Sequence, residues 1–425
     1  MTVEQPEFGR RVREVRRARG LSQTDIAGDG MSPSYISLVE SGHRTPSPKV
    51  VRAIAERLDV PLDELSSPET PREQQRTHRL ELVGRLVAAR SYQRAGDHGS
   101  ARDALLDVIR RASGSGMEDA LWEARWELAA TYGRLGDEAA REETLRLLLA
   151  DPLTGAAPQL RARVAVETAD LLRGSGKLSE SVRLSEEALR ALPAGEAGAP
   201  ERLQAQVSLL SGWLESGEWQ RGEELCDDIL RSADALPAGQ LPATALWAAA
   251  EYRYVAGRPE PAVGLLDRAL ELTGPETDTT VRVRMLWAAA LLHLATGRPD
   301  AAGALVERFG RAVEVLGTPA DATRLAMLRT LTELHHGTER ALEWAGEAER
   351  GRAELPPVDR ARCTVALARA YRAAERAEEA EAEYKAAAAL CEAAGAYRFA
   401  AAVWRELSVP GAPAGTADHC AVVTP

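Results

Sequence analysis

The chain has 425 residues, of which 45% are hydrophobic and 28% charged, a balance typical of a folded globular protein. No apolar run approaches about eighteen residues, and no apolar stretch follows a basic one near residue 1, so we expect neither a membrane span nor a secretory signal and place the protein in the cytoplasm. The net charge of −11 argues against DNA binding by the whole chain, but residues 1–60 carry ten basic and eight acidic side chains, a local balance of +2.

Residues 1–65 predict a small domain of five helices. The first helix is expected over residues 7–19 and the second over residues 21–27. Ser32, followed by Pro33, is typical of the start of a third helix, which Gly42 ends. Apolar residues at helical spacing predict a fourth helix over residues 49–60, and a short closing element follows it.

The segment S-P-S-Y-I-S-L-V-E-S-G at residues 32–42, preceded by Gln23 and by Ile-Ala at 26–27, resembles the phage-repressor family of helix-turn-helix domains. The resemblance implies that the third helix enters the major groove of double-stranded DNA. The residues that it assigns to base or phosphate contacts are Gln23, Thr24, Ser32, Ser34, Tyr35, Leu38, His43 and Arg44. It also implies that Arg16 and Glu40 pair with each other inside the domain.

Beyond the first domain, glycines recur at a fixed interval. Gly96, Gly136, Gly176, Gly217, Gly257, Gly297 and Gly337 are 40 or 41 residues apart, and Glu375 takes the eighth place 38 residues later. Small residues lie seven positions before most of these turns and large residues four before several of them. This order resembles the tetratricopeptide repeat, although HEAT-type solenoids also have repeats of about 40 residues.

The repeats predict an all-α architecture of four parts. We expect a helix-turn-helix domain over residues 1–65, a linker over 66–76, a repeat domain over 77–407 and a disordered tail over 408–425. The repeat domain is predicted to be a right-handed α-solenoid of about eight tetratricopeptide-like hairpins that ends in a capping helix.

In this repeat family the first helix of each hairpin lines a concave groove. The side chains there that we expect to bind a ligand are Arg90, Trp126, Asp170, Arg173, Trp247, Glu251, Tyr254 and Trp287. Aromatic anchors beside arginines and carboxylates suit an extended peptide. The tryptophans have an alternative role, because an apolar stripe at helical spacing is usually core that packs between neighbouring hairpins.

The sequence contains no convincing enzymatic signature. The run GSGK at 174–177 lacks the earlier glycine of a phosphate-binding loop, and the four cysteines lack metal-ligand spacing. We therefore predict a protein that is not an enzyme, with no catalytic residue, metal or cofactor.

A repressor-type head on a tetratricopeptide-like body resembles the peptide-pheromone receptor regulators of Gram-positive bacteria. The resemblance implies a quorum-sensing transcription regulator, a homodimer on a palindromic operator, in which a short peptide in the repeat groove controls dimer geometry. The alternative is a transcription regulator whose repeat domain docks another protein and takes no small ligand.

Overall fold

A computed structural model of the chain describes residues 4–28, 30–66, 71–193, 200–274, 277–408 and 422–425. The chain divides into two compact units, residues 1–131 and 132–425. The described residues are helical, with no strand beyond one bridge pair between Gly28 and Met31. None of the described helices combines the length and the apolar character that a membrane crossing requires.

The first unit begins with four short helices around one apolar core. They are α1 (Glu7–Ala18), α2 (Pro33–Glu40), α3 (Pro48–Leu58) and α4 (Leu62–Ser66). Phe8, Val12, Ile36 and Ile54 are among the core side chains that these helices bury. Gly9 allows α1 to cross the end of α2 closely, since a Cβ atom there would lie 1.9 Å from the carbonyl oxygen of Val39.

The five-helix prediction for this domain fails at its second helix. Residues 21–27 form two consecutive turns, in which Asp25 donates to the Ser22 carbonyl and Ala27 to the Thr24 carbonyl, both at 3.2 Å. Gly28 and Met31 then exchange two backbone hydrogen bonds of 2.9 Å each. So short a segment cannot offset the cost of helix nucleation once this tight turn ends it.

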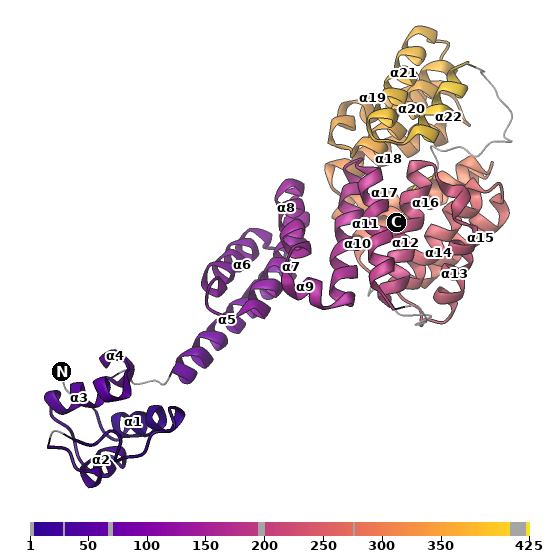
Figure 1. Ribbon diagram of the computed structural model, residues 1–425. Coiled ribbons are helices and arrows are strands. Elements are labelled where there is room, and N and C mark those ends of the chain that lie inside the picture. The colour runs from indigo at the N-terminus through magenta and orange to yellow at the C-terminus, as the bar shows by residue number, and fades with distance from the viewer. Residues whose placement is uncertain (1–3, 29, 67–70, 194–199, 275–276, 409–421) are drawn as a thin grey trace. The chain divides into compact units, whose positions relative to one another are not determined.

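The repeats form eight successive helix pairs, as the glycine spacing predicts (Figure 1). The pairs are α5 (Pro71–Arg94) with α6 (His98–Ala112), α7 (Glu118–Leu135) with α8 (Glu138–Leu149), α10 (Pro158–Gly174) with α11 (Leu178–Ala191), α12 (Pro200–Ser216) with α13 (Glu223–Asp234), α14 (Gln240–Val255) with α15 (Pro259–Leu272), α16 (Thr279–Ala295) with α17 (Pro299–Leu316), α18 (Pro319–Glu333) with α19 (Thr338–Gly351), and α20 (Pro357–Ala373) with α21 (Ala377–Ala393). The short α9 (Pro152–Ala156) lies between the second and third pairs, and α22 (Tyr397–Ser408) follows the last.

The turn within most pairs depends on a left-handed residue. Six of the eight predicted turn residues are glycines with φ between 73° and 87°. At Gly257, for example, its N–H donates to the Tyr254 carbonyl at 3.0 Å and the next N–H reaches the Arg253 carbonyl at 2.8 Å, which closes the end of α14. Gly337 departs from the pattern with φ 160°, whereas Glu375 adopts the left-handed conformation at φ 59° without being a glycine.

The second unit folds back on itself. Leu178 at the start of α11 is buried in a cluster with Val358, Phe399 and other residues of α20–α22. In the short 3-10 helix Trp219–Arg221 that follows α12, the Trp219 ring lies under the guanidinium of Arg398 from α22, 5.6 Å from the ring centroid. The eighth pair and its capping helix therefore pack against the third and fourth pairs, and the inner face of this unit is enclosed.

Residues 409–421 of the predicted disordered tail lie outside the described residues. Val422–Pro425 do not, and for these four residues the structure differs from the prediction. Val422, Val423 and Thr424 are at most 4% exposed, and both valines belong to the largest apolar cluster of the second unit. Sequence pattern did not indicate this burial because two valines are too few to show a period.

The left-handed turns predict a pair of opposite stability changes. Gly257→Ala should lower the free energy of unfolding by about 1 kcal/mol, because a Cβ atom meets nothing within 4 Å there and only the backbone conformation is penalised. Gly264→Ala, in the middle of α15 and equally unobstructed, should raise it by about 0.5–1 kcal/mol. Chemical denaturation of both variants measures the two changes, and equal signs would contradict the assignment.

Candidate DNA interface and ligand groove

Helix α2 presents a polar outer face. The Ser32 hydroxyl accepts a hydrogen bond from the Tyr35 N–H at 3.1 Å, so the helix begins at Pro33 as the sequence predicts. Ile36 and Val39 are buried beneath it. Ser34 is exposed on the other side and Leu38 is 48% exposed. The exposed face of α2 is therefore the surface available for contact with bases.

A buried ion pair fixes α1 to the end of α2. Arg16 donates to both carboxylate oxygens of Glu40, at 2.6 and 3.0 Å, which confirms the predicted pairing. Gln23 adds a hydrogen bond to Glu40 at 2.8 Å. Burial opposes ionisation of Glu40, but the hydrogen bonds from Arg16 and Gln23 lower its pKa overall. The amide of Gln23 thus ties residues 21–27 to α2, and its phosphate contact stays a prediction.

The loop after α2 is held by its backbone and leaves its side chains outside. The N–H groups of His43 and Arg44 both donate to the Leu38 carbonyl, at 2.9 and 3.1 Å. Gln5 donates to the Arg44 carbonyl at 2.8 Å. The side chains of Thr24, His43 and Arg44 are exposed and Tyr35 is half-buried, and their contacts with DNA stay predictions.

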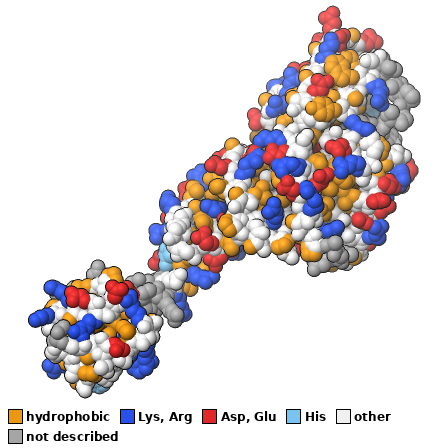
Figure 2. Space-filling model, in the orientation of Figure 1, with side chains coloured by type: hydrophobic (Ala, Val, Ile, Leu, Met, Phe, Trp, Pro, Cys, Tyr) orange, Lys and Arg blue, Asp and Glu red, His pale blue; other side chains and the backbone are white. Residues whose placement is uncertain are grey.

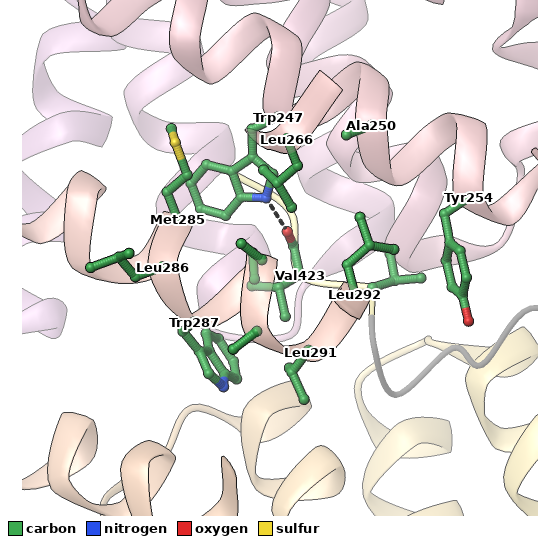
Figure 3. Close-up of a cluster of buried hydrophobic side chains, with 14 of the residues drawn as sticks. Trp247, Ala250, Tyr254, Leu266, Met285, Leu286, Trp287, Leu291, Leu292 and Val423 are labelled. Carbon is green, nitrogen blue, oxygen red and sulfur yellow. Dashed lines mark hydrogen bonds between the residues drawn. The ribbon is translucent and has the colours of Figure 1, made fainter. Parts of the chain in front are cut away.

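The predicted groove of the second unit is filled by the segment Val422–Pro425. Trp247 donates its indole N–H to the Val423 carbonyl at 2.6 Å (Figure 3). Arg362 donates to the Val422 carbonyl. Trp247 and Trp287 are 1% and 0% exposed, so both tryptophans belong to the core, and one of them also binds backbone.

A second set of contacts holds the other end of this segment. Arg173 donates to the Thr424 hydroxyl at 2.5 Å and to the Pro425 carbonyl oxygen. The Thr424 hydroxyl donates in turn to Glu215, which also pairs with Arg173 at 3.2 Å. The predicted ligand residues Arg173 and Trp247 therefore bind one short extended segment from opposite ends.

An arginine cluster borders the Val422 end. Asp359 accepts from Arg324 at 2.8 Å and from Arg362 at 2.6 Å. Burial works against ionisation of Asp359, but the positive charges of Arg324, Arg362 and Arg284 outweigh it and lower the pKa to about 2. The guanidinium groups of Arg324 and Arg362 lie 5.2 and 5.9 Å from the centroid of the Trp287 ring, within reach of cation–π attraction.

Glu251 lies in the same groove without a strong ionic partner. It is completely buried, and burial raises its pKa well above the usual range. The charge of Arg362 and polar contacts with the Val423 backbone and Trp247 only partly oppose this effect. Burial therefore favours the protonated form of Glu251.

The remaining predicted ligand residues are more dispersed. Tyr254 is buried, and Asp170 lies at the edge of the groove, where it accepts from Ser208 at 2.8 Å and lies 3.6 Å from Arg173. Arg90 and Trp126 belong to the first unit. There Arg90 pairs with Glu123 and Glu127, and Trp126 stacks on Trp122 with 5.7 Å between ring centroids.

Sequence reasoning missed three arginines at one repeat position. Arg284, Arg324 and Arg362 lie thirteen residues before Gly297, Gly337 and Glu375, one helical turn ahead of the stripe that contains the tryptophans. Reading the same helix face three residues further toward the start of each helix would have identified these arginines from the sequence. Burial lowers the pKa of Arg284 to about 10, and this side chain faces Asp359, Arg324, Arg173 and Glu215. On the surface shown in Figure 2, by contrast, acidic and basic side chains are intermixed.

Comparisons with known proteins match both parts of the chain. A helix-turn-helix family model matches residues 12–65. The HTH-type transcriptional regulator YazB of Bacillus subtilis is 35% identical over 68 residues, which are 16% of this chain and 99% of the relative. RghRB of the same organism is 42% identical over 60 residues, 14% of this chain and 43% of the relative.

One solved structure shares the fold over most of the chain. It is the crystal structure of a Rap protein complexed with competence and sporulation factor, with a TM-score of 0.56 and 14% identity, and the match covers 92% of this chain and 97% of that one. At this identity the likeness shows the arrangement of helices alone.

Protonation of Glu251 predicts a pH-dependent stability. Because its folded-state pKa is raised, the stabilising contribution is complete below the unfolded-state pKa and is lost as pH rises toward the folded-state value. As the pH rises above about 5, where the unfolded-state carboxyl is ionised, the melting temperature of the wild type should therefore fall relative to that of Glu251→Gln, which needs no proton. Thermal unfolding across this range is the measurement.

The matched control for this experiment is Glu260→Gln, since the Glu260 side chain is 78% exposed. Its melting curve should stay parallel to that of the wild type at every pH. Parallel curves for Glu251→Gln as well would show that Glu251 is ionised in the folded protein.

Proposed function

We propose that this chain, which belongs to the helix-turn-helix transcriptional regulators, is a cytoplasmic, sequence-specific DNA-binding protein whose repeat groove senses a short peptide. Peptide binding alters the geometry of a homodimer and hence its affinity for a palindromic operator. The observation that carries this proposal is the groove itself, in which Arg173, Trp247 and Arg362 bind the backbone of an extended segment.

The chemistry of the groove supports a peptide rather than a small metabolite. Its donors reach the backbone oxygens of Val422, Val423 and Pro425, and binding through main-chain atoms is typical of peptide recognition. The Rap protein with the same arrangement of helices is complexed with competence and sporulation factor. A sensor of this kind requires a ligand that prefers one state of the protein over the other.

The small net charge of the helix-turn-helix domain supports an operator that two such domains bind together. The domain has exposed arginines in α1 and after α2, but its net charge over residues 1–60 is only +2, so a single domain has a modest phosphate footprint. A dimer doubles these contacts and matches half-sites about one helical turn apart. Control of the distance between two heads is then sufficient to control binding.

The proposal is tested by operator affinity. Selection from random DNA with the purified full chain yields the operator, and fluorescence anisotropy then measures its affinity while short peptides are titrated. We expect at least one peptide to change operator affinity at least tenfold and to change the hydrodynamic size of the dimer. If no peptide alters either quantity and a stoichiometric protein partner does, the repeat domain is a docking scaffold and peptide sensing is excluded.

Two substitutions separate specificity from general affinity. Leu38→Ala should reduce discrimination at one base pair by about 1–3 kcal/mol, because an apolar side chain on the outer face of α2 is suited to a thymine methyl group. Arg44→Ala should weaken binding to all sequences alike and lower the salt slope by about one. Competition binding at several salt concentrations measures both, and Arg350→Ala, an exposed arginine of α19, is the control.

A further inference from the structure

The segment Val422–Pro425 and the groove match each other closely enough to define a ligand. We infer that the groove is a peptide site that the chain's own C-terminal segment occupies as a tethered ligand, and that an external peptide of the same chemistry must displace it. The role of the external peptide rests on the proposed function. The occupancy of the groove by Val422–Pro425 stands on the contacts alone.

The backbone contacts explain why a separate peptide can take the same place. Arg362, Trp247 and Arg173 bind the carbonyl oxygens of Val422, Val423 and Pro425. Carbonyl groups are common to every peptide, so these contacts give affinity without depending on side chains. None of the three donors needs the segment to be part of the same chain.

The side-chain contacts define the class of ligand. Val422 and Val423 lie in the apolar cluster that includes Trp247 and Leu291 (Figure 3). The Thr424 hydroxyl lies between Arg173 and Glu215 and bonds to both. The groove is therefore complementary to a short extended peptide with two adjacent β-branched apolar residues followed by a hydroxyl-bearing residue.

The groove without an occupant would leave polar groups unsatisfied. Arg173 keeps Glu215 as a partner and Arg362 keeps Asp359. The buried indole N–H of Trp247 loses its hydrogen bond to the Val423 carbonyl when the segment leaves, which leaves the Glu251 carboxyl group as its polar neighbour, and loss of a buried hydrogen bond is costly. This donor favours a state in which the groove is filled, by the tethered segment or by a competitor.

The test compares binding of one probe, the fluorescently labelled peptide Ala-Val-Val-Thr-Pro, to three proteins. They are the full chain, a chain ending at Ser408, and the full chain with Val423→Asp, which places a charge in the apolar cluster. We expect both altered proteins to bind the probe in fluorescence anisotropy at least tenfold more tightly than the full chain does. Circular dichroism melting shows whether each protein is folded. If the chain ending at Ser408 does not fold, the comparison of Val423→Asp with the full chain still tests the inference.

The controls address the groove and the sequence of the probe. In the chain ending at Ser408, Arg173→Ala should reduce probe binding at least tenfold, whereas Arg350→Ala on α19 should leave it unchanged. The labelled peptide Ala-Asp-Asp-Thr-Pro, with both valines replaced, should not bind. Equal probe affinity for all three proteins, or no binding by any folded one, would overturn the inference.

Failure of this inference and failure of the proposed function have different signatures. If the probe does not bind but another peptide changes operator affinity, the tethered ligand is excluded and peptide sensing stands. If the probe binds the emptied groove but no peptide changes operator affinity, the tethered ligand stands and peptide control of DNA binding falls.

Discussion

The inner face of the repeat domain exists because the last helix pair packs against the third. Leu178 of α11 is buried among α20–α22, and Arg398 of α22 covers Trp219. An open row of hairpins would leave Arg173, Glu251 and Asp359 in water, where their charges interact weakly. In the folded protein the three side chains are only 6%, 0% and 5% exposed, so little water surrounds them.

Enclosure of the inner face also has a cost in free energy, because it removes charged groups from water. Charges removed from water pay a desolvation penalty that a single ion pair often fails to recover. Here Asp359 has two arginine partners, and the same two arginines lie over the Trp287 ring, so these three charges each have more than one compensating interaction. Such a wall contributes little to stability compared with an apolar one. Its use is to present fixed donors to a chain segment lying against it.

The sequence predicts the local parts of this structure well. Seven turn glycines and Glu375 locate all eight helix pairs, and seven of these eight residues are left-handed, which is a local backbone requirement at a helix end. The pairing of Arg16 with Glu40 followed from the family resemblance, whereas binding of a ligand by Arg173 and Trp247 stays a prediction. The base and phosphate contacts of α2 and of the turns around it remain predictions, since they need DNA to be tested.

What the sequence did not predict is non-local or too short to carry a period. The return of α20–α22 onto Leu178 joins positions about 200 residues apart, and a repeat pattern does not indicate where the superhelix closes. Residues 21–27 carry a helix signal, but the Gly28–Met31 turn limits them to turns. Val422 and Val423 are held by apolar packing of their side chains and by hydrogen bonds to their carbonyl groups. No sequence motif indicates either kind of contact.

The connection between Ser408 and Val422 affects the concentration of free peptide to which such a sensor would respond. Thirteen residues separate the end of α22 from the bound segment, so a displaced segment stays attached to the same molecule. Short connections of this kind give local concentrations of about a millimolar. A free peptide of equal intrinsic affinity would have to reach a comparable concentration to occupy half of the grooves. The length of that connection, rather than the groove alone, would then set the threshold above which the regulator responds.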